Sequence, residues 1–500
     1  MRNTLLIPAL VLLVAAPGRA QDPSAPPPVM REFRGLWVAT VANIDWPSKP
    51  GESTWDQQRE LLAILDKAVS LNMNAIVLQI RPGADAFYAS PYEPWSQFLT
   101  GRQGRAPEPM WDPLQFAVEQ AHARGLELHA WFNPYRAAYT TDTAAARTHI
   151  TQTHPEMVHP YGHFIWMDPG DPEVRRRAVR AIVDVVKRYD VDGVHIDDYF
   201  YPYPENDSAG HRIDFPDSAT YARYVKHGGT LAKDDWRRQN VNALVEALFK
   251  GVRAAKPWVK VGISPFGIWR PGNPAQIKGF DGYQEIYADS KLWLQNGWLD
   301  YLAPQLYWPI QPPAQSFPVL YDWWRSQNTK HRHIWPGVAS YRVNGNGARH
   351  IPAQEIVDEI DTVRAKGGDM GLIHFNASVM MKDPDSLDEK LLTRYAAPAL
   401  IPASPWLGAT PPAKPRITLG RDRATGDLDV SLTPGKGVKV WWWTVRSDSA
   451  GTWETEVLPG WLRTHRLPRS AVSEVVVTAV SRSGVESPPA SHEERDPRRE

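Results

Sequence analysis

The sequence predicts an α/β protein in which a (β/α)8 TIM barrel is followed by a smaller C-terminal β-sandwich. From residue 35 onward, short apolar runs alternate with longer segments of helical period, and eight such units lie before residue 400. This alternation is typical of parallel βα units. Past Ala397 the helical period ends and strand-like runs follow. A doubly wound open sheet is the main alternative, but no GxGxxG or Walker-type glycine loop follows any run.

Eight apolar runs are the predicted strands of the barrel, which is expected to occupy residues 31–400. Their sequences are GLWVATV (35–41), AIVLQIRP (75–82), LELHAWFNP (126–134), VDGVHIDDY (191–199), VKVGISPFG (259–267), LDYLAPQLYW (299–308), HIWPGVASY (333–341) and MGLIHFNAS (370–378). Helices are predicted between them, and several begin at Asp or Asp-Pro and end at Gly, as helix starts and stops commonly do.

The region after the barrel is predicted to contain a linker, a β domain and a tail. Residues 401–415 (IPASPWLGATPPAKP) are rich in Pro, and residues 416–488 include DLDVSLT, VKVWWWTVR and SEVVVTAVSR. These runs have strand composition without a helical period, which favours a β-sandwich. The ending VVVTAVSRSGVES resembles the last two strands of a fibronectin type III domain. Residues 489–500 are predicted to be a solvated charged tail.

The N-terminus predicts export. Residues 1–20 have a positive Arg2, an apolar stretch from Leu5 to Ala16, and small residues at Gly18 and Ala20, which together indicate a cleaved signal peptide. A membrane anchor is the alternative, but about a dozen apolar residues fall short of the roughly 20 that span a bilayer. We therefore expect a mature chain without a membrane span, either periplasmic or secreted, with a disordered lead-in at 21–30.

Composition narrows the range of partners. Lys+Arg and Asp+Glu number 56 each, so no long-range field attracts nucleic acid or anionic lipid, and a neutral or locally recognised partner is expected. Cysteine is absent, which excludes disulfides, thiolate metal sites, cysteine nucleophiles and acylation of an N-terminal Cys.

Polar side chains are predicted to converge on the barrel axis. In the fourth strand, Val194 and Ile196 form the helix-facing set, which leaves His195, Asp197 and Tyr199 directed inward. The same alternation in three other strands directs further polar and aromatic residues inward, namely Gln79, Arg81, His129, Trp131, Asn133, Gln305 and Tyr307. Because barrel enzymes place their chemistry at the carboxyl ends of the strands, the site is expected there.

A carboxylate among aromatic and amide side chains suits glycoside hydrolysis, which needs an acid for the leaving oxygen and a second stabilising group. Asp197 is the predicted catalytic carboxylate, assisted by Asp198 or Glu285, with Asp289, Glu93 and Asp45 as further loop candidates. Asp198 points away from the axis in a regular strand but re-enters if the chain bends. As an acid, Asp197 needs a pKa raised by burial or by a neighbouring carboxylate. Sugar contacts are predicted for Trp37, Asn43, Arg81, His129, Asn133, Tyr135, Arg136, His195, Tyr199, Gln305, Tyr307 and Trp308.

Other chemistries have weaker support. His129, His195 and Asp197 could ligate zinc, but the first strand has no HxH and no HExxH occurs, so no metal or other cofactor is expected. Serine hydrolysis lacks a GxSxG motif. The alternative from a different class is a non-catalytic carbohydrate-binding or scaffolding barrel of the cell envelope, because no Glu stands at a strand end.

Seven dispersed motifs resemble the glycosyl-hydrolase-like 10 family. They are REFRGLWVATVANIDWPS, NAIVLQIRPGADAFYASPYEPWS, HAWFNPYR, VDGVHIDDYFYP, GISPFGIWR, YQEIYADSKLWLQNGWLDYLAPQLYW and GLIHFNAS, within residues 31–400. This family includes bacterial envelope glycosidases that cut peptidoglycan strands stripped of stem peptides. The resemblance implies a (β/α)8 barrel and a substrate of β-1,4-linked N-acetylglucosamine and N-acetylmuramic acid. Some relatives are lipoproteins, but this chain has no Cys to acylate.

The stretch DGVHIDDYFYP is also similar to the DGxDxDxEYP strand of chitinase-type enzymes. The similarity implies acids at Asp192 and Asp197, while His195 and Tyr199 stand where that pattern has its second Asp and its Glu. The missing Glu leaves the role of acid to Asp197, Asp198 or a loop carboxylate. The C-terminal sandwich is expected to bind glycan, to dock onto the cell wall or another protein, or to cap the barrel.

Overall fold

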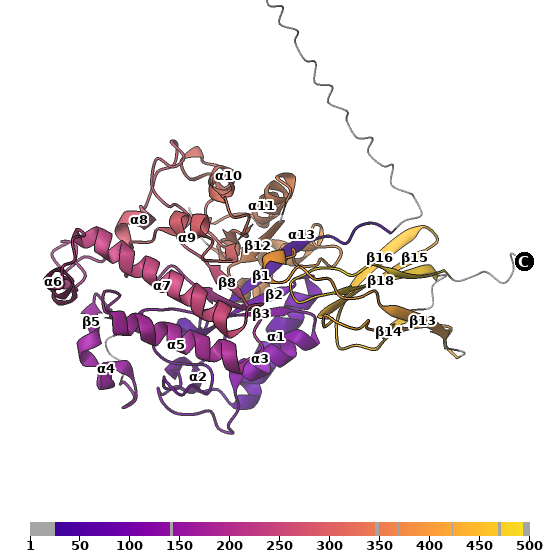
Figure 1. The fold of residues 1–500 in the computed structure, drawn as a ribbon, viewed down its shortest axis with the longest axis horizontal. Coiled ribbons are helices and arrows are strands. Elements are labelled where there is room, and N and C mark those ends of the chain that lie inside the picture. Colours follow the sequence, from indigo (N-terminus) through magenta and orange to yellow (C-terminus); the bar gives the residue numbers. More distant parts are fainter. Residues whose placement is uncertain are drawn as a thin grey trace, which may run out of the picture.

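A computed structural model describes residues 26–140, 144–345, 350–368, 370–422, 424–468 and 472–493. The predicted signal peptide, the start of the lead-in and most of the predicted tail therefore lie outside the described residues. The chain forms a barrel of helices around a sheet, with a smaller unit of β-strands at one end (Figure 1). No helix in the described ranges is long and apolar enough to cross a membrane.

The barrel contains every predicted strand. They are β1 (Glu32–Val38), β2 (Ala75–Arg81), β3 (Glu127–Phe132), β7 (Gly193–Ile196), β8 (Lys260–Ile263), β9 (Tyr301–Leu302), β10 (His333–Ile334), β11 (Gly337–Val338) and β12 (Met370–His374). Within the described residues they form one parallel sheet in the order β10-β9-β8-β7-β3-β2-β1-β12-β11. β10 and β11 are the two halves of the seventh predicted strand. Because one half pairs with β9 and the other with β12, the sheet closes.

Helices cover the outside of the sheet as predicted. They include α1 (Thr54–Ser70), α3 (Pro113–Ala123), α5 (Pro172–Arg188), α7 (Lys233–Ala255), α9 (Ser290–Asn296), α10 (Phe317–Gln327), α11 (Ala353–Ala365) and α13 (Leu387–Leu392). The Asp-Pro starts act as helix caps, since Asp112 accepts hydrogen bonds from the backbone of Leu114 and Gln115, and Asp171 accepts one from Glu173.

Shorter elements occupy the enlarged loops. They are α2 (Gln97–Thr100), β4 (Arg136–Ala138), α4 (Ile150–Thr153), β5 (Val158–Tyr161), β6 (Phe164–Met167), α6 (Ser218–Lys226), α8 (Gly282–Glu285) and α12 (Ala377–Lys382). β4, β5 and β6 form a small antiparallel sheet in the order β4-β6-β5. These insertions follow β2, β3 and later strands, so they build the walls above the carboxyl ends of the barrel.

The alternation of side chains separates two buried clusters. One packs between sheet and helices and includes Ile76, Leu78, Leu128, Val194 and Ile196. The other fills the barrel interior with Phe33, Trp37, Val77, Trp131, Tyr301, Trp335 and Ile373. The predicted assignment of helix-facing and inward-facing residues in the second, third and fourth strands is therefore confirmed except at Arg81. The pairing of β2 with β3 shifts register between Gln79 and Arg81, and Arg81 pairs with Glu93 instead of reaching the axis.

The C-terminal region forms two antiparallel sheets. β13 (Arg416–Arg421), β14 (Leu428–Thr433) and β17 (Thr464–Leu467) make one, in the order β13-β14-β17. β15 (Trp442–Ser449), β16 (Thr452–Pro459), β18 (Val472–Val480) and β19 (Ala490–Glu493) make the other, in the order β16-β15-β18-β19. Both contribute to one buried cluster, as in a sandwich. The second sheet extends into the predicted tail, because Ala490 is buried and pairs with Val477.

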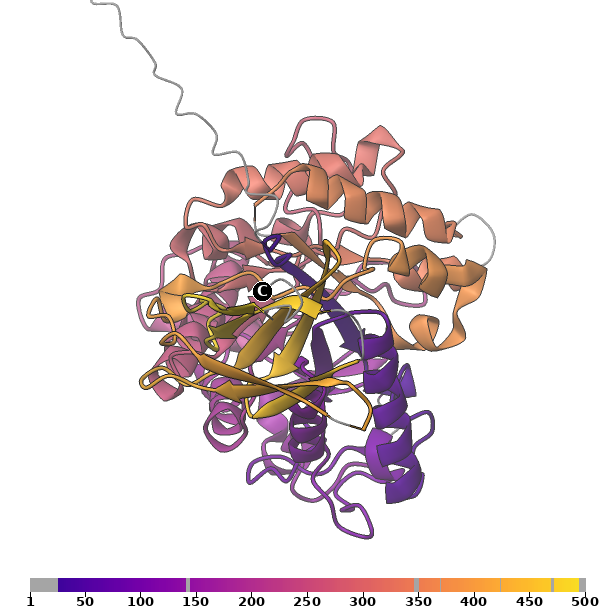
Figure 2. The same cartoon turned by 90° about the vertical axis from the view of Figure 1, so that its right-hand side faces the viewer.

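The sandwich contacts the amino ends of the barrel strands, and Figure 2 looks onto it with the barrel behind. Arg482 forms an ion pair with Asp192, at the start of β7, and its guanidinium lies 4.0 Å from the ring centroid of Trp441. In the linker, Trp406 Nε1 donates to Asp300 Oδ1 (2.8 Å) just before β9. Asp192, which the chitinase-like pattern marked as an acid, therefore joins the two domains and lies at the end of the barrel opposite the predicted site.

Candidate functional site

A cavity of about 380 Å³ opens at the carboxyl ends of the barrel strands. Almost every strand contributes a lining residue, either from its last positions or from the turn that follows. The described lining residues are Trp37, Ala39, Val41, Ile44, Gln79, Trp131, Arg136, Tyr139, Asp197, Asp198, Tyr199, Tyr203, Ser264, Phe266, Gln305, Tyr307, Trp308 and Phe375. The volume falls within the range of small-ligand pockets, roughly 300–1,000 Å³, and the lining is rich in aromatic rings.

Asp197 lies at the floor of this cavity, directly after β7, and its residue is 3% exposed. Its Oδ2 accepts a hydrogen bond from Trp131 Nε1 (2.9 Å) and a longer one from Asn133 Nδ2 (3.4 Å). Its Oδ1 accepts from the backbone N–H of Tyr199 (3.3 Å), which closes an Asx turn and ends the strand. The carboxyl is thus held by side chains of β3 and by its own turn.

The turn also brings Asp198 into the cavity. The backbone N–H of Phe200 donates to the Asp198 carbonyl (3.0 Å), so the chain bends instead of continuing the strand alternation. Asp198 is 5% exposed, and its Oδ2 accepts a hydrogen bond from the Tyr203 hydroxyl. The two adjacent carboxyl groups therefore line the same cavity, the outcome expected for a bent strand end.

The environment raises the pKa of both carboxyl groups. Burial is the main cause for Asp197, and the neighbouring Asp198 carboxylate adds to it, so the pKa of Asp197 reaches about 7 although the Arg136 guanidinium and the Trp131 N–H oppose the rise. Burial also raises the pKa of Asp198, while the Tyr203 hydroxyl and the Gln305 amide favour its ionised form. Asp197 consequently holds its proton close to neutral pH.

Beneath the cavity floor, a chain of hydrogen bonds runs down the barrel axis. Trp37 Nε1 donates to His195 Nε2 (3.3 Å), which places the His195 proton on Nδ1, facing the Tyr301 hydroxyl (3.0 Å). That hydroxyl can then donate to His129 Nδ1 (2.8 Å), and His129 Nε2 donates to Glu127 (3.0 Å). Burial and the nearby His129 hold the pKa of His195 well below its usual range, so a neutral ring fits this network.

Two glycines make room for these rings. A Cβ on Gly262 of β8 would lie 1.9 Å from the ring of Tyr301, and one on Gly193 of β7 would lie 2.7 Å from the ring of His129. Any side chain at either position would displace the network that supports the floor. His129 and His195 therefore support the cavity without lining it.

Arg136 forms one wall of the cavity. Its guanidinium lies 4.4 Å from the ring centroid of Tyr199, and its Nη1 donates to the Pro82 carbonyl (3.1 Å). Its backbone N–H donates to Asn133 Oδ1 (2.8 Å), so the turn after β3 fixes both residues. Across the cavity, the ring of Tyr307 stacks on Phe375 at 6.0 Å, and Trp308 meets Phe266 edge to face at 5.5 Å.

The predicted site residues thus divide into three groups. Those that line the cavity are Trp37, Arg136, Asp197, Asp198, Tyr199, Gln305, Tyr307 and Trp308. Asn133, His129 and His195 lie behind them in hydrogen-bonding positions. Arg81, Asn43 and Tyr135 lie elsewhere: Arg81 is buried in an ion pair with Glu93, Asn43 donates to the carbonyls of Pro47 and Phe98, and Tyr135 is buried in the outer core.

The structure does not bring the loop carboxylates into the cavity. Glu285 pairs with Arg212 at 2.5 Å at the end of α8. Asp289 caps α9 and accepts from Trp269 Nε1 (3.1 Å), and Asp45 accepts backbone N–H groups of Ala39 (2.7 Å) and Ser378 (2.8 Å). With Glu93 held by Arg81, Asp198 is the predicted assisting carboxylate that remains beside Asp197.

Several residues that line the cavity were not predicted from the sequence. Tyr203, Ser264, Phe266, Tyr139 and Phe375 follow strand ends in irregular turns, where no periodicity gives the direction of a side chain. Tyr203 had one usable signal, since it closes the aromatic cluster that directly follows Asp197 and Asp198. Among the described residues, no group of three or more His, Asp or Glu side chains is arranged to hold a metal ion.

Comparison with known proteins places the chain in a family. Residues 32–352 match the sequence model described as glycosyl hydrolase-like 10. Over 409 residues the chain is 44% identical to glycosyl hydrolase YngK of Bacillus subtilis (strain 168), covering 80% of this chain and 78% of that protein. It is 35% identical over 355 residues to glycosyl hydrolase DigH of Escherichia coli (strain K12), covering 66% and 78%.

Among solved structures, the glycoside hydrolase domain of PgaB (BpsB) from Bordetella bronchiseptica is 14% identical, with a TM-score of 0.46 over 73% of this chain and 99% of that domain. This similarity is too low to assign the fold, so the assignment of a barrel is based on the strand order described above. The match to the family model covers more than half of the chain. The protein therefore belongs to the glycosyl hydrolase-like 10 family.

Proposed function

We propose that this protein is a glycoside hydrolase that cleaves β-1,4 linkages of bacterial cell-wall glycan, with peptidoglycan strands lacking stem peptides as its substrate. The observation that supports this most strongly is Asp197. It is a buried carboxyl at the floor of an aromatic-lined cavity, and its pKa is raised to about 7. A carboxyl that keeps its proton near neutral pH is what a general acid of this chemistry requires.

The proposed reaction gives the two carboxyl groups different roles. Asp197 donates its proton to the glycosidic oxygen as the bond from that oxygen to the anomeric carbon breaks. Asp198 is favoured as the ionised partner, because the Tyr203 hydroxyl and the Gln305 amide oppose the rise that burial causes in its pKa. Its negative charge then stabilises the positive charge that develops on the sugar ring. Water completes the hydrolysis and returns a proton to Asp197.

The substrate class is supported by the lining and by the family. Trp37, Trp131, Tyr307 and Phe375 offer ring faces to the apolar C–H side of a sugar and to an acetamido methyl group. Arg136 and Gln305 offer donors to hydroxyl and carbonyl oxygens. The restriction to stem-free strands rests on the resemblance to envelope glycosidases.

We also propose that the chain is exported and that its sandwich is of the fibronectin type III kind. The signal-like N-terminal sequence supports export. Two sheets in the orders β13-β14-β17 and β16-β15-β18-β19 support the fibronectin type III assignment. Because the sandwich sits at the amino ends of the barrel strands, it could contact the cell wall or another protein without covering the cavity.

The test is parallel digestion of stem-free and intact peptidoglycan, with the new reducing ends identified by mass spectrometry. We expect disaccharide-repeat fragments from the stem-free strands and far fewer from the intact polymer. If neither substrate yields products, the non-catalytic carbohydrate-binding barrel becomes the better interpretation.

A further inference from the structure

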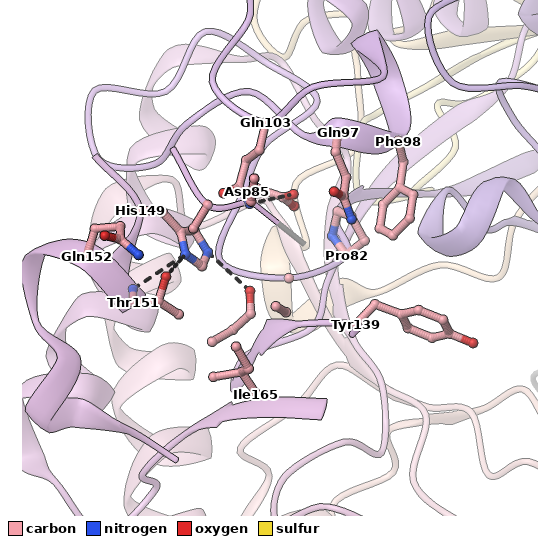
Figure 3. Close-up of a pocket in the computed structure, with 15 residues that line it drawn as sticks. Pro82, Asp85, Gln97, Phe98, Gln103, Tyr139, His149, Thr151, Gln152 and Ile165 are labelled. Atoms are coloured by element: carbon pink, nitrogen blue, oxygen red, sulfur yellow. Dashed lines mark hydrogen bonds between the residues drawn. The ribbon is translucent and has the colours of Figure 1, made fainter. Parts of the chain in front are cut away.

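A second cavity, of about 320 Å³, lies beside the first at the carboxyl ends of β2 and β3. Its walls come from the loop after β2, from α2, from β4 and the residue after it, from α4 and from β6 (Figure 3). Tyr139, which follows β4, lines both cavities. The ring of Tyr139 meets Phe98 edge to face at 6.3 Å, so aromatic surface continues from the first cavity into the second.

Asp85 gives this second cavity a polar group, one oxygen of which has no hydrogen-bond partner in the described residues. The residue is 4% exposed, and its Oδ1 is buried with no hydrogen-bond partner in the described part of the chain. Its Oδ2 accepts a long hydrogen bond from Gln103 Nε2 (3.3 Å), drawn in Figure 3, and the Ser96 and Gln103 side chains both favour its ionised form. A buried polar atom without a partner costs free energy, and such atoms in a cavity mark places where a ligand can bind.

The remaining walls favour a neutral ligand with hydroxyl or amide groups. Phe98, Tyr139 and Ile165 are apolar surfaces, and Gln97 and Gln152 add amides that can donate and accept (Figure 3). No Lys or Arg is among the described lining residues, so an anion gains no ion pair there. Burial raises the pKa of Asp85 to about 6, so the carboxyl is still mostly ionised near neutral pH and acts there as a hydrogen-bond acceptor.

His149 completes a wall without taking part in recognition. Its Nε2 donates to the Ala137 carbonyl (3.2 Å), and its Nδ1 faces the Thr151 hydroxyl at 2.8 Å. Burial lowers the pKa of His149 to about 4, so the ring is neutral at physiological pH and both of its nitrogens are already engaged. His149 therefore leaves hydrogen bonding to a ligand to Asp85 and to the amides of Gln97 and Gln152.

We propose that this second cavity is a distal sugar subsite, in which Asp85 accepts a hydrogen bond from a hydroxyl or acetamido N–H of the glycan while Phe98 and Tyr139 contact its ring. The inference rests on the proposed glycosidase function and extends it. Tyr139 connects the reacting sugar to the distal one, so the protein recognises chains longer than the pair of sugars at the scissile bond.

The test measures binding, so that it does not depend on turnover. In the Asp197→Asn background, which is expected to bind without cleaving, the dissociation constant is measured by calorimetry for stem-free glycan oligomers of increasing length. Affinity should rise about tenfold at the length that reaches the second cavity, as expected for one added hydrogen bond to a buried carboxyl together with ring contacts. Adding Asp85→Ala, or separately Gln152→Ala, should remove most of that rise and leave the affinity of the shortest oligomer unchanged. Gln354→Ala, on the exposed face of α11, is the matched control and should change neither value.

The proposal is overturned if Asp85→Ala and Gln152→Ala both keep the full gain in affinity with oligomer length. It is also overturned if both variants weaken binding of the shortest oligomer as much as that of the longest, or if no oligomer binds at all. Thermal melting of each variant shows whether it is folded. If Asp85→Ala does not fold, the Gln152→Ala variant alone tests the proposal. Failure of the proposed function gives a different result, because a protein that binds long glycan but cleaves none refutes the hydrolase assignment and leaves the distal subsite standing.

Discussion

At the scale of single residues, the site is defined by two consecutive carboxyl groups with different partners. Asp197 accepts from the indole of Trp131 and from a backbone N–H, whereas Asp198 accepts from the phenol of Tyr203. Both are buried, and the Asp198 carboxylate adds to the cost of ionising Asp197. Such a pair favours a state in which Asp197 is protonated and Asp198 is ionised. Acid catalysis by one carboxyl and charge stabilisation by the other need this arrangement.

The raised pKa of Asp197 predicts that this residue destabilises the folded protein at neutral and alkaline pH. Its pKa is about 7 in the folded state and 3.8 in the unfolded reference, so its contribution to stability is fully present below about pH 4 and is lost as the pH rises through 7. Asp197→Asn should therefore be more stable than the native chain at about pH 8, with a higher melting temperature and an unfolding free energy larger by up to about 4 kcal/mol. This difference in stability should shrink toward about pH 4. Differential scanning calorimetry across that range measures it. An advantage that is independent of pH would contradict the burial account.

At the scale of secondary-structure elements, the sequence predicted the position of every barrel strand and the direction of most side chains within them. Period-two alternation placed Gln79, Trp131 and Gln305 on the axis, because the pleat fixes direction wherever the strand is regular. Asp198 could not be oriented from the pattern, since the turn at Asp197 ends the pleat. The strands are also shorter than predicted: β9 is only Tyr301–Leu302, and Pro304, which cannot donate a ladder hydrogen bond, lies two residues after its end.

The site residues that could not be predicted from the sequence lie in the turns after the strands. Tyr139, Tyr203 and Phe375 reach the cavity from irregular segments, where direction depends on tertiary contacts instead of local periodicity. Glu285 was predicted from its place after the fifth strand, but α8 directs it to Arg212, an ion pair formed with a residue far away in the chain. Long-range pairing of this kind leaves no local signature.

The hydrogen bond from Tyr203, in the loop after β7, should affect how kcat depends on pH. Tyr203→Phe removes the hydroxyl that donates to Asp198, so the pKa of Asp198 should rise further and the acidic limb of the kcat profile should move to higher pH. We expect kcat to fall about ten- to a hundredfold with little change in KM, the loss typical of one hydrogen bond to a charged group. Tyr161→Phe, in β5 outside the cavity, is the control and should leave the profile unchanged. A uniform loss of activity without movement of the acidic limb would contradict the assigned role of Tyr203.

At the scale of the whole molecule, the cavities and the sandwich lie at opposite ends of the barrel. The cavities lie at the carboxyl ends of the strands, whereas the linker and sandwich contact residues at the amino ends, among them Asp192, Asp300 and His333. Ile401 of the linker even packs into the interior cluster of the barrel. Attachment through the sandwich therefore leaves the cavities free for glycan.

This separation predicts the effect of removing the sandwich. A chain truncated after Gly408 keeps Ile401 and Trp406 in place, so kcat on soluble glycan oligomers should stay within about twofold, as expected for distant sites that share no partners. Its melting temperature should fall, because Asp192 loses Arg482. Binding to purified sacculi, measured by sedimentation, should weaken. A folded truncation that loses turnover would show that the sandwich contributes to the reaction.

The most direct test of the central claim is turnover of stem-free glycan by Asp197→Asn, with Asp289→Asn as the matched control at a half-buried carboxyl outside the cavity. We expect kcat to drop by about 10²- to 10⁴-fold in the first variant, the usual contribution of a general acid, while glycan binding persists and Asp289→Asn retains activity. Cleavage at the native rate by a folded Asp197→Asn protein would contradict the assignment of this carboxyl as the proton donor.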